Sequence, residues 1–150
     1  MQNTIHQLQQ ILLKYTPLLF QISEAEFSEK PFPLKWSKKE IVGHLIDSAQ
    51  NNIRRFVVAQ YEEKPFIKYD QDRWVAAGNY QNYNVEDLLA LWGLLNKHIC
   101  VLLKNIPEEI AGRVADAGGL RTISWLAEDY NKHLLHHLHK ILSLEEIPYP

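Results

Sequence analysis

The chain has 150 residues, of which 46% are hydrophobic, and its 16 basic and 18 acidic residues give a net charge of -2. This length fits one domain, residues 1–150, and the balanced charge offers neither a basic surface for nucleic acid nor an acidic tail. The chain begins without a secretory signal and contains no run of about 18 apolar residues. We therefore expect a cytoplasmic protein that binds neither nucleic acid nor a membrane.

Residues 4–23 carry apolar side chains at intervals of three and four, which is typical of a helix with one buried face. Pro17 is expected to kink or split this helix because it lacks a backbone donor. Residues 28–34 include Pro31 and Pro33. Each proline also restrains the residue before it, so this segment is predicted to be a linker.

A second helix is predicted from Ser37 to about residue 61. Ser37 and Glu40 have the spacing of a capping box, in which the two side chains satisfy free backbone donors. The helix has apolar positions for packing, yet His44, Ser48 and Asn52 form a polar stripe at four-residue steps. A purely structural helix would bury apolar groups there, because each buried polar group needs a partner. The stripe therefore indicates a functional face.

Residues 62–84 are predicted to be mostly irregular. A connection this long is usually functional or contains a short helix, and residues 72–77 could form one or two helical turns. The aromatic side chains of the segment indicate that it packs down as a lid; they are Phe66, Tyr69, Trp74, Tyr80 and Tyr83.

A third helix is predicted from its cap at Asn84 to about Pro107, followed by a connection over residues 106–121. The fourth helix starts at Thr122 or Ser124 and contains no Gly or Pro up to residue 147. Four long helices, without a convincing strand pattern or an internal repeat, predict an all-α four-helix bundle of antiparallel type. Its long connections argue against a simple series of up-and-down hairpins.

Four of the seven histidines lie within residues 133–139 of the fourth helix. His133 and His137 stand one turn apart on the same face of that helix. Two imidazoles so placed can bind one divalent metal ion, and a catalytic site usually has about three protein ligands and an open position. His44, in the polar stripe, is the candidate third ligand, because sites in helical bundles are built from facing helices.

These residues also have plainer interpretations. A histidine-rich tract can be a solvated helix end, and a lone histidine among apolar residues is more often a satisfied core residue than a ligand. His136 is interpreted as bordering the pocket and His139 as solvated. Cys100 lies in an apolar helical pattern, so we interpret it as a packing residue and not as a nucleophile.

The sequence resembles the YfiT-like branch of the DinB superfamily. Residues 43–56 are similar to its His-x-x-Asp-Ser-x-x-Asn-x-x-x-Arg segment, and residues 36–40 are similar to the start of that helix. Residues 69–74 resemble its Tyr-Asp-x-x-x-Trp loop. Its final helix is matched by residues 124–126 together with Tyr130, His133, His136 and His137. The resemblance covers nearly the whole chain in the right order.

The resemblance implies a DinB-like four-helix bundle that holds one divalent metal ion through His44, His133 and His137. The ion is expected to be nickel or zinc, with iron and manganese as the alternatives. Family members are often homodimers and are described as metal-dependent hydrolases, and other relatives are thiol-dependent S-transferases and isomerases that use bacillithiol, mycothiol or glutathione. Ala49 and Lys140 stand where close relatives often carry histidine, which leaves the substrate preference open.

Three further residues are assigned catalytic roles. Asp47 is the candidate acceptor for the remaining ring proton of His44 or of another ligand, with a surface or capping carboxylate as the alternative. Asn51 and Arg55 would orient the groups around the metal or bind an anionic substrate. For Arg55 a salt bridge to another helix is an equal alternative.

Three hypotheses follow for the function. The first is a metal-dependent enzyme acting on a small molecule, either a hydrolase that uses metal-bound water or a thiol-dependent S-transferase whose second substrate is a low-molecular-weight thiol. The second is a metal-binding stress-response or interaction module without turnover. The third is a metal-free helical interaction protein.

Overall fold

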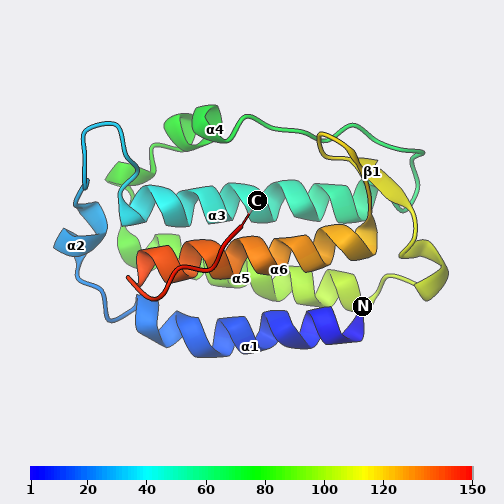
Figure 1. Cartoon of the computed structure of the whole chain (residues 1–150), viewed down its shortest axis with the longest axis horizontal. Coiled ribbons are helices and arrows are strands. Elements are labelled where there is room, and N and C mark those ends of the chain that lie inside the picture. The colour runs from blue at the N-terminus through cyan, green and yellow to red at the C-terminus, as the bar shows by residue number, and fades with distance from the viewer. Residues whose placement is uncertain (150) are drawn as a thin grey trace.

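The computed structural model describes residues 1–149. Its elements follow in the order α1 (Gln2–Leu19), α2 (Glu24–Ser28), α3 (Lys38–Val58), α4 (Gln71–Gly78), the 3-10 turn η1 (Tyr80–Asn82), α5 (Val85–Lys104), the 3-10 turn η2 (Glu108–Ile110), β1 (Val114–Asp116), β2 (Leu120–Thr122) and α6 (Ile123–Ile141). The long helices α1, α3, α5 and α6 form a four-helix bundle, which confirms the predicted fold class (Figure 1).

The bundle places α1 diagonally opposite α3, and α5 diagonally opposite α6. Helix α1 packs against α5 and α6, and α3 packs against the same two helices. In Figure 1, α3 and α5 run in one direction, and α1 and α6 run in the other. The pairs α3–α5 and α1–α6 are therefore parallel, so the bundle is not a simple series of up-and-down hairpins, as its long connections predicted. The long connection from α3 to α5 explains this, because the chain returns along the bundle before it enters α5.

The helix starts follow their capping residues. The Ser37 hydroxyl accepts a hydrogen bond from the backbone N–H of Glu40, and the Glu40 carboxylate accepts one from the N–H of Ser37. Asn84 caps α5, and Thr122 caps α6 through the N–H of Trp125. Pro17 neither splits nor ends α1, since it lies in the last turn and the helix ends two residues later.

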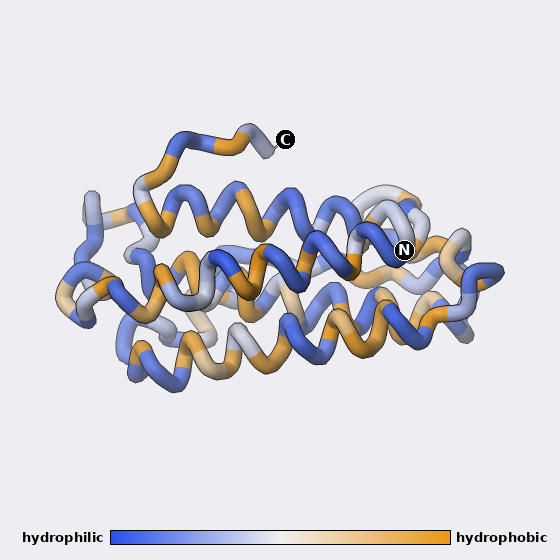
Figure 2. The backbone as a smooth tube through the Cα atoms, turned by 90° about the horizontal axis from the view of Figure 1, so that it is seen from below, coloured by the Kyte–Doolittle hydropathy of each residue, from blue (hydrophilic) through white to orange (hydrophobic). Residues whose placement is uncertain are grey.

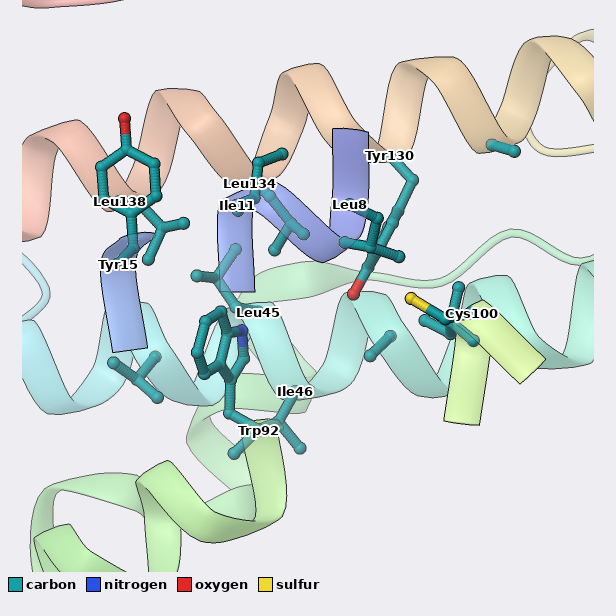
Figure 3. Close-up of a cluster of buried hydrophobic side chains, with 14 of the residues drawn as sticks. Leu8, Ile11, Tyr15, Leu45, Ile46, Trp92, Cys100, Tyr130, Leu134 and Leu138 are labelled. Carbon is teal, nitrogen blue, oxygen red and sulfur yellow. The ribbon is translucent and has the colours of Figure 1, made fainter. Parts of the chain in front are cut away.

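The core is apolar and continuous between the four helices. It includes Trp92, Tyr130 and Leu134, and Cys100 packs among the same side chains, as expected from its helical pattern (Figure 3). Figure 2 shows hydrophobic and hydrophilic residues alternating along each helix, which is typical of helices with one buried face. Among residues 1–149, no helix combines the length and apolar composition needed to cross a membrane.

The connections contain structure that the sequence did not indicate. Strands β1 and β2 pair antiparallel, and Gly118 and Gly119 form their turn with positive φ angles of 100° and 155°. Strands of three residues are too short for a period-two pattern to be recognised. The predicted lid is pinned to this hairpin, because the N–H of Ile67 donates to the carbonyl of Asp116.

Candidate metal centre

Three imidazole rings meet between α3 and α6. One ring nitrogen from each of His44, His133 and His137 lies within 4.8 Å of the others, and the Nε2 atoms of His44 and His133 are 3.0 Å apart. The ring centroids are separated by 4.5 to 4.9 Å. The structure therefore brings together the three histidines that the sequence singled out, although their role as ligands stays a prediction.

The three rings are held in the neutral state that metal binding requires. Burial lowers the pKa of His44 to about 4 and that of His137 to about 3. Burial and then the neighbouring histidines hold the pKa of His133 well below 6.5. A neutral imidazole offers a nitrogen lone pair, so this donor set fits a divalent ion such as zinc or nickel at neutral pH.

The outer nitrogens of the rings have different surroundings. Nδ1 of His133 lies 3.4 Å from the hydroxyl of Ser48, which can accept its proton and leave Nε2 free. Nδ1 of His44 and Nδ1 of His137 are buried without a partner among residues 1–149. The Trp36 ring lies over His44, with 5.2 Å between their centroids. Packing therefore fixes the position of His44.

Asp47 has a different partner from the one expected. Its Oδ1 accepts a hydrogen bond from the hydroxyl of Tyr80, and its Oδ2 is buried without a partner among residues 1–149. Burial raises the pKa of this carboxyl to about 6, and the bond from Tyr80 acts in the opposite direction. The expected hydrogen bond from a metal-binding histidine is therefore not made. Tyr80 is buried beside α3, and this packing keeps its hydroxyl against the carboxylate.

Asn51 does not reach the imidazoles, whereas Arg55 lines the cavity beside them. The Asn51 amide donates to the backbone carbonyl of Asp47 within α3, at 2.9 Å, so it orients none of the imidazoles. Its neighbour Asn52 lines the cavity beside the histidines instead, because residues 44, 48, 52 and 55 share one face of the helix. Arg55 lines that cavity too and forms no salt bridge to another helix within residues 1–149.

The other two histidines of the cluster anchor the C-terminal tail, residues 142–149. His136 Nδ1 donates to the carbonyl of Ile147, and His139 Nδ1 donates to that of Glu145. Nε2 of His139 lies 2.7 Å from the hydroxyl of Tyr15, so the expectation that His139 is solvated is wrong. The tail folds back beside α6, and the Tyr149 hydroxyl donates to Asp129 (Figures 1 and 2).

Two cavities border the histidines. The first, of about 280 Å³, is lined by His44, His133 and polar residues toward the middle of α3, and the second, of about 500 Å³, is lined by His137, Trp36 and the segment before α3. Gln71, the first residue of α4, lines both. The centre is therefore reached from two sides.

Several lining residues were not recognised from the sequence as parts of a site. The first cavity includes Lys68, Gln71, Asp129 and Tyr149, which come from the lid, from α6 and from the tail. Tyr69, one of the aromatic residues of the predicted lid, lines the first cavity and contacts the Trp74 ring. Nothing in the local pattern around Tyr149 indicated that the tail would turn back over α6.

Two bacterial proteins are similar to this chain in sequence. A protein of Oceanobacillus iheyensis named "Putative metal-dependent hydrolase OB0782" is 30% identical over 119 residues, which are 73% of this chain and 64% of that protein. A Bacillus licheniformis protein, also named as a putative metal-dependent hydrolase, is 28% identical over 64% of this chain and 58% of its own length. The chain thus spans less than two thirds of both relatives.

Solved structures have the same fold. YfiT from Bacillus subtilis, described as "a probable metal-dependent hydrolase with an unusual four-helix bundle topology", superposes with a TM-score of 0.83 at 22% identity and covers 95% of this chain and 83% of its own. A mycothiol-dependent maleylpyruvate isomerase superposes with a TM-score of 0.80 at 16% identity, over 97% of this chain and 61% of its own. The family model of the DinB superfamily matches residues 7–141, and the chain belongs to this superfamily.

Proposed function

We propose that this protein is a metal-dependent enzyme whose divalent ion is held by His44, His133 and His137. The convergence on one point of three neutral imidazoles, that of His44 buried and the other two half-buried, carries the proposal. A bound divalent ion would lower the pKa of water and stabilise a thiolate, which are the two chemistries that the sequence predicted. Zinc and nickel are the first candidates, because imidazole nitrogen suits both ions.

The residues around the imidazoles would orient them. Ser48 would accept the Nδ1 proton of His133. Asp47 remains the candidate acceptor for His44, because Nδ1 of His44 and Oδ2 of Asp47 are both buried without a partner among residues 1–149 and lie one turn apart in α3. Trp36 would exclude water from one side of His44. In this proposal Asn51 supports Asp47 through the α3 backbone, and Arg55 faces the reactant.

Hydrolysis of a small molecule is the first candidate reaction, in keeping with the names of the relatives. A thiol-dependent S-transferase is the second candidate, and one observation favours it: one cavity is lined by His137 and another by His44 and His133, so two organic molecules have separate places beside the three histidines. The homodimer, the cytoplasmic location and the extent of the single domain over residues 1–150 stay predictions.

Metal analysis of protein purified without a nickel column tests the proposal. We expect about one ion per chain, either as purified or after addition of zinc or nickel. His44→Ala should abolish this uptake, whereas His98→Ala, at an exposed position of α5, should not. Wild-type protein that takes up no zinc or nickel, and melts at the same temperature with and without chelator, would favour the metal-free interaction protein.

Turnover then separates the enzyme from the metal-binding module. Ester and amide substrates should be cleaved without added thiol if the protein is a hydrolase, and electrophiles should react only with added thiol if it is a transferase. Either activity should require the ion and be lost in His44→Ala. Stoichiometric metal binding without any such activity would favour the non-catalytic module.

A further inference from the structure

A buried arginine, Arg55, lines the cavity of about 280 Å³ beside His44 and His133. Arg55 lies there and is only 8% exposed. Its Nε donates to the carbonyl of Ile67 at 3.0 Å, and its Nη1 donates to the amide oxygen of Asn52 at 3.3 Å. Both acceptors are neutral, and no carboxylate forms an ion pair with this guanidinium within residues 1–149.

A buried cation that forms no ion pair is costly, and a ligand that pairs with it offsets this cost. The two existing hydrogen bonds hold the plane of the guanidinium in place. They leave Nη2 without a partner among residues 1–149, on a side chain that lines the cavity. A planar guanidinium presented in this way matches the two oxygens of a carboxylate.

The charges around the cavity limit the charge of the ligand. Arg55 and Lys68 contribute two positive charges and Asp129 one negative charge, so the fixed side chains carry a net charge of about +1 with neutral histidines. Asp129 is half-buried, its Oδ2 accepts a hydrogen bond from Tyr149, and it forms no ion pair with Arg55, although its charge acts on the guanidinium from across the cavity. In the metal-free protein a single carboxylate balances this sum, whereas a phosphate dianion exceeds it.

We infer that this cavity binds the carboxylate of a small organic acid, with Arg55 as the main contact and Lys68 at the rim. The inference deepens the proposed function, because His44 and His133 line the same cavity and the remainder of an anchored acid would lie against them. Arg55 is then the residue that selects acidic substrates. This assignment depends on the burial of Arg55 and on its lack of an ion pair within residues 1–149, and not on the metal.

Propionate and its neutral isostere propionamide test the inference, with the Nε–H resonance of Arg55 in an NMR titration as the readout. Propionate should shift this resonance saturably and propionamide should not. Arg55→Gln should weaken propionate binding, measured by ligand-observed NMR, by about tenfold or more. Arg54→Gln is the matched control, because it removes the same charge from an exposed neighbour on α3 and should leave binding unchanged.

Two further arms keep the test independent of folding and of the metal. Lys68→Gln alters an exposed side chain and should weaken binding by about two- to fivefold even if Arg55→Gln unfolds. Wild-type protein treated with chelator, which would lose the metal, should still bind propionate. If propionate binds through Arg55 while the wild type takes up no ion, only the metal proposal fails.

Other outcomes overturn the inference. Equal shifts with propionate and propionamide would show that charge is not recognised. Equal binding by the Arg54 and Arg55 variants would place the anion elsewhere. Tighter binding of inorganic phosphate than of propionate to protein kept in chelator would make the assignment to a carboxylate wrong.

Discussion

The Nε2 atoms of His44 and His133 lie 3.0 Å apart, although 89 positions separate the two residues in the chain. Such proximity suits two neutral rings and opposes two protonated ones, because like charges at this distance repel. The bundle therefore holds these rings in a form that is favourable for a metal ion and unfavourable for protons.

Acid should destabilise the metal-free protein through these rings. Burial lowers the pKa of His44 to about 4 and that of His137 to about 3, whereas an exposed histidine has a pKa of about 6.5. Below pH 6.5 the unfolded chain therefore binds protons that the folded chain does not, and each histidine removes about 1.4 kcal/mol of stability per pH unit. Above pH 6.5 these histidines are neutral in both the folded and the unfolded chain, so they cause no loss of stability there.

Urea unfolding in chelator between pH 7.5 and pH 4.5 measures this loss. His44→Gln should reduce the slope of stability against pH, whereas His98→Gln, at an exposed site, should keep it. Identical slopes for wild type and His44→Gln would show that His44 is not held neutral by the fold.

The metal should depend on His133 and not on its neighbour His136. His133→Ala removes one of the three converging nitrogens and should weaken zinc binding by about a hundredfold or more, as measured by calorimetry. His136→Ala removes only the hydrogen bond to the carbonyl of Ile147 and should leave zinc affinity nearly unchanged. A similar loss in both variants would instead indicate a disturbed helix α6.

Tyr80→Phe should destabilise the protein more at pH 8 than at pH 5. The substitution leaves the buried Asp47 carboxylate without its donor, at a cost of about 1–3 kcal/mol when the group is ionised. The pKa of Asp47 is already raised to about 6 in the folded state, so at pH 5 the group is largely protonated and the cost is smaller. Chemical denaturation at the two pH values measures the difference. Tyr83→Phe, at an exposed position, should have little effect at either.

Two glycines on helices should respond in opposite directions to alanine. A Cβ at Gly43 would lie 2.0 Å from Cδ2 of the Tyr80 ring, which its hydrogen bond to Asp47 holds in place. Gly43→Ala should therefore lower stability by about 1–3 kcal/mol. A Cβ at Gly93 meets nothing within 4 Å, so Gly93→Ala should raise stability by about 0.5–1 kcal/mol. Thermal melting of both variants decides the matter, and equal effects would contradict the contact with Tyr80.

Short-range patterns in the sequence predicted the helix starts and the helix faces that carry the three histidines. The capping residues Ser37, Asn84 and Thr122 marked the helix starts, because capping is a contact within one turn. The spacing of His133 and His137 placed both rings on one face, and the polar stripe on α3 pointed to His44 as the third ring. The direction of α5 relative to α3 could not be predicted from the sequence, since it depends on the path of the connection between the two helices.

Contacts between distant segments account for what the sequence did not predict. Tyr80 reaches Asp47 only because the segment after α4 packs onto α3, and no spacing in the sequence shows this. Tyr149 enters the cavity because the tail turns back after α6, where Ser143 adopts a positive φ of 53°. The left-handed conformations of Asn79 and Ser143 turn the chain after α4 and α6, but they do not fix which distant residue the following tyrosine contacts.

The two cavities that share Gln71 also bear on kinetics. One is lined by His137 and the other by His44 and His133, so a molecule in either position leaves the other open to solvent. A reaction of two substrates here would proceed through a ternary complex in random order, and its double-reciprocal plots would intersect instead of running parallel.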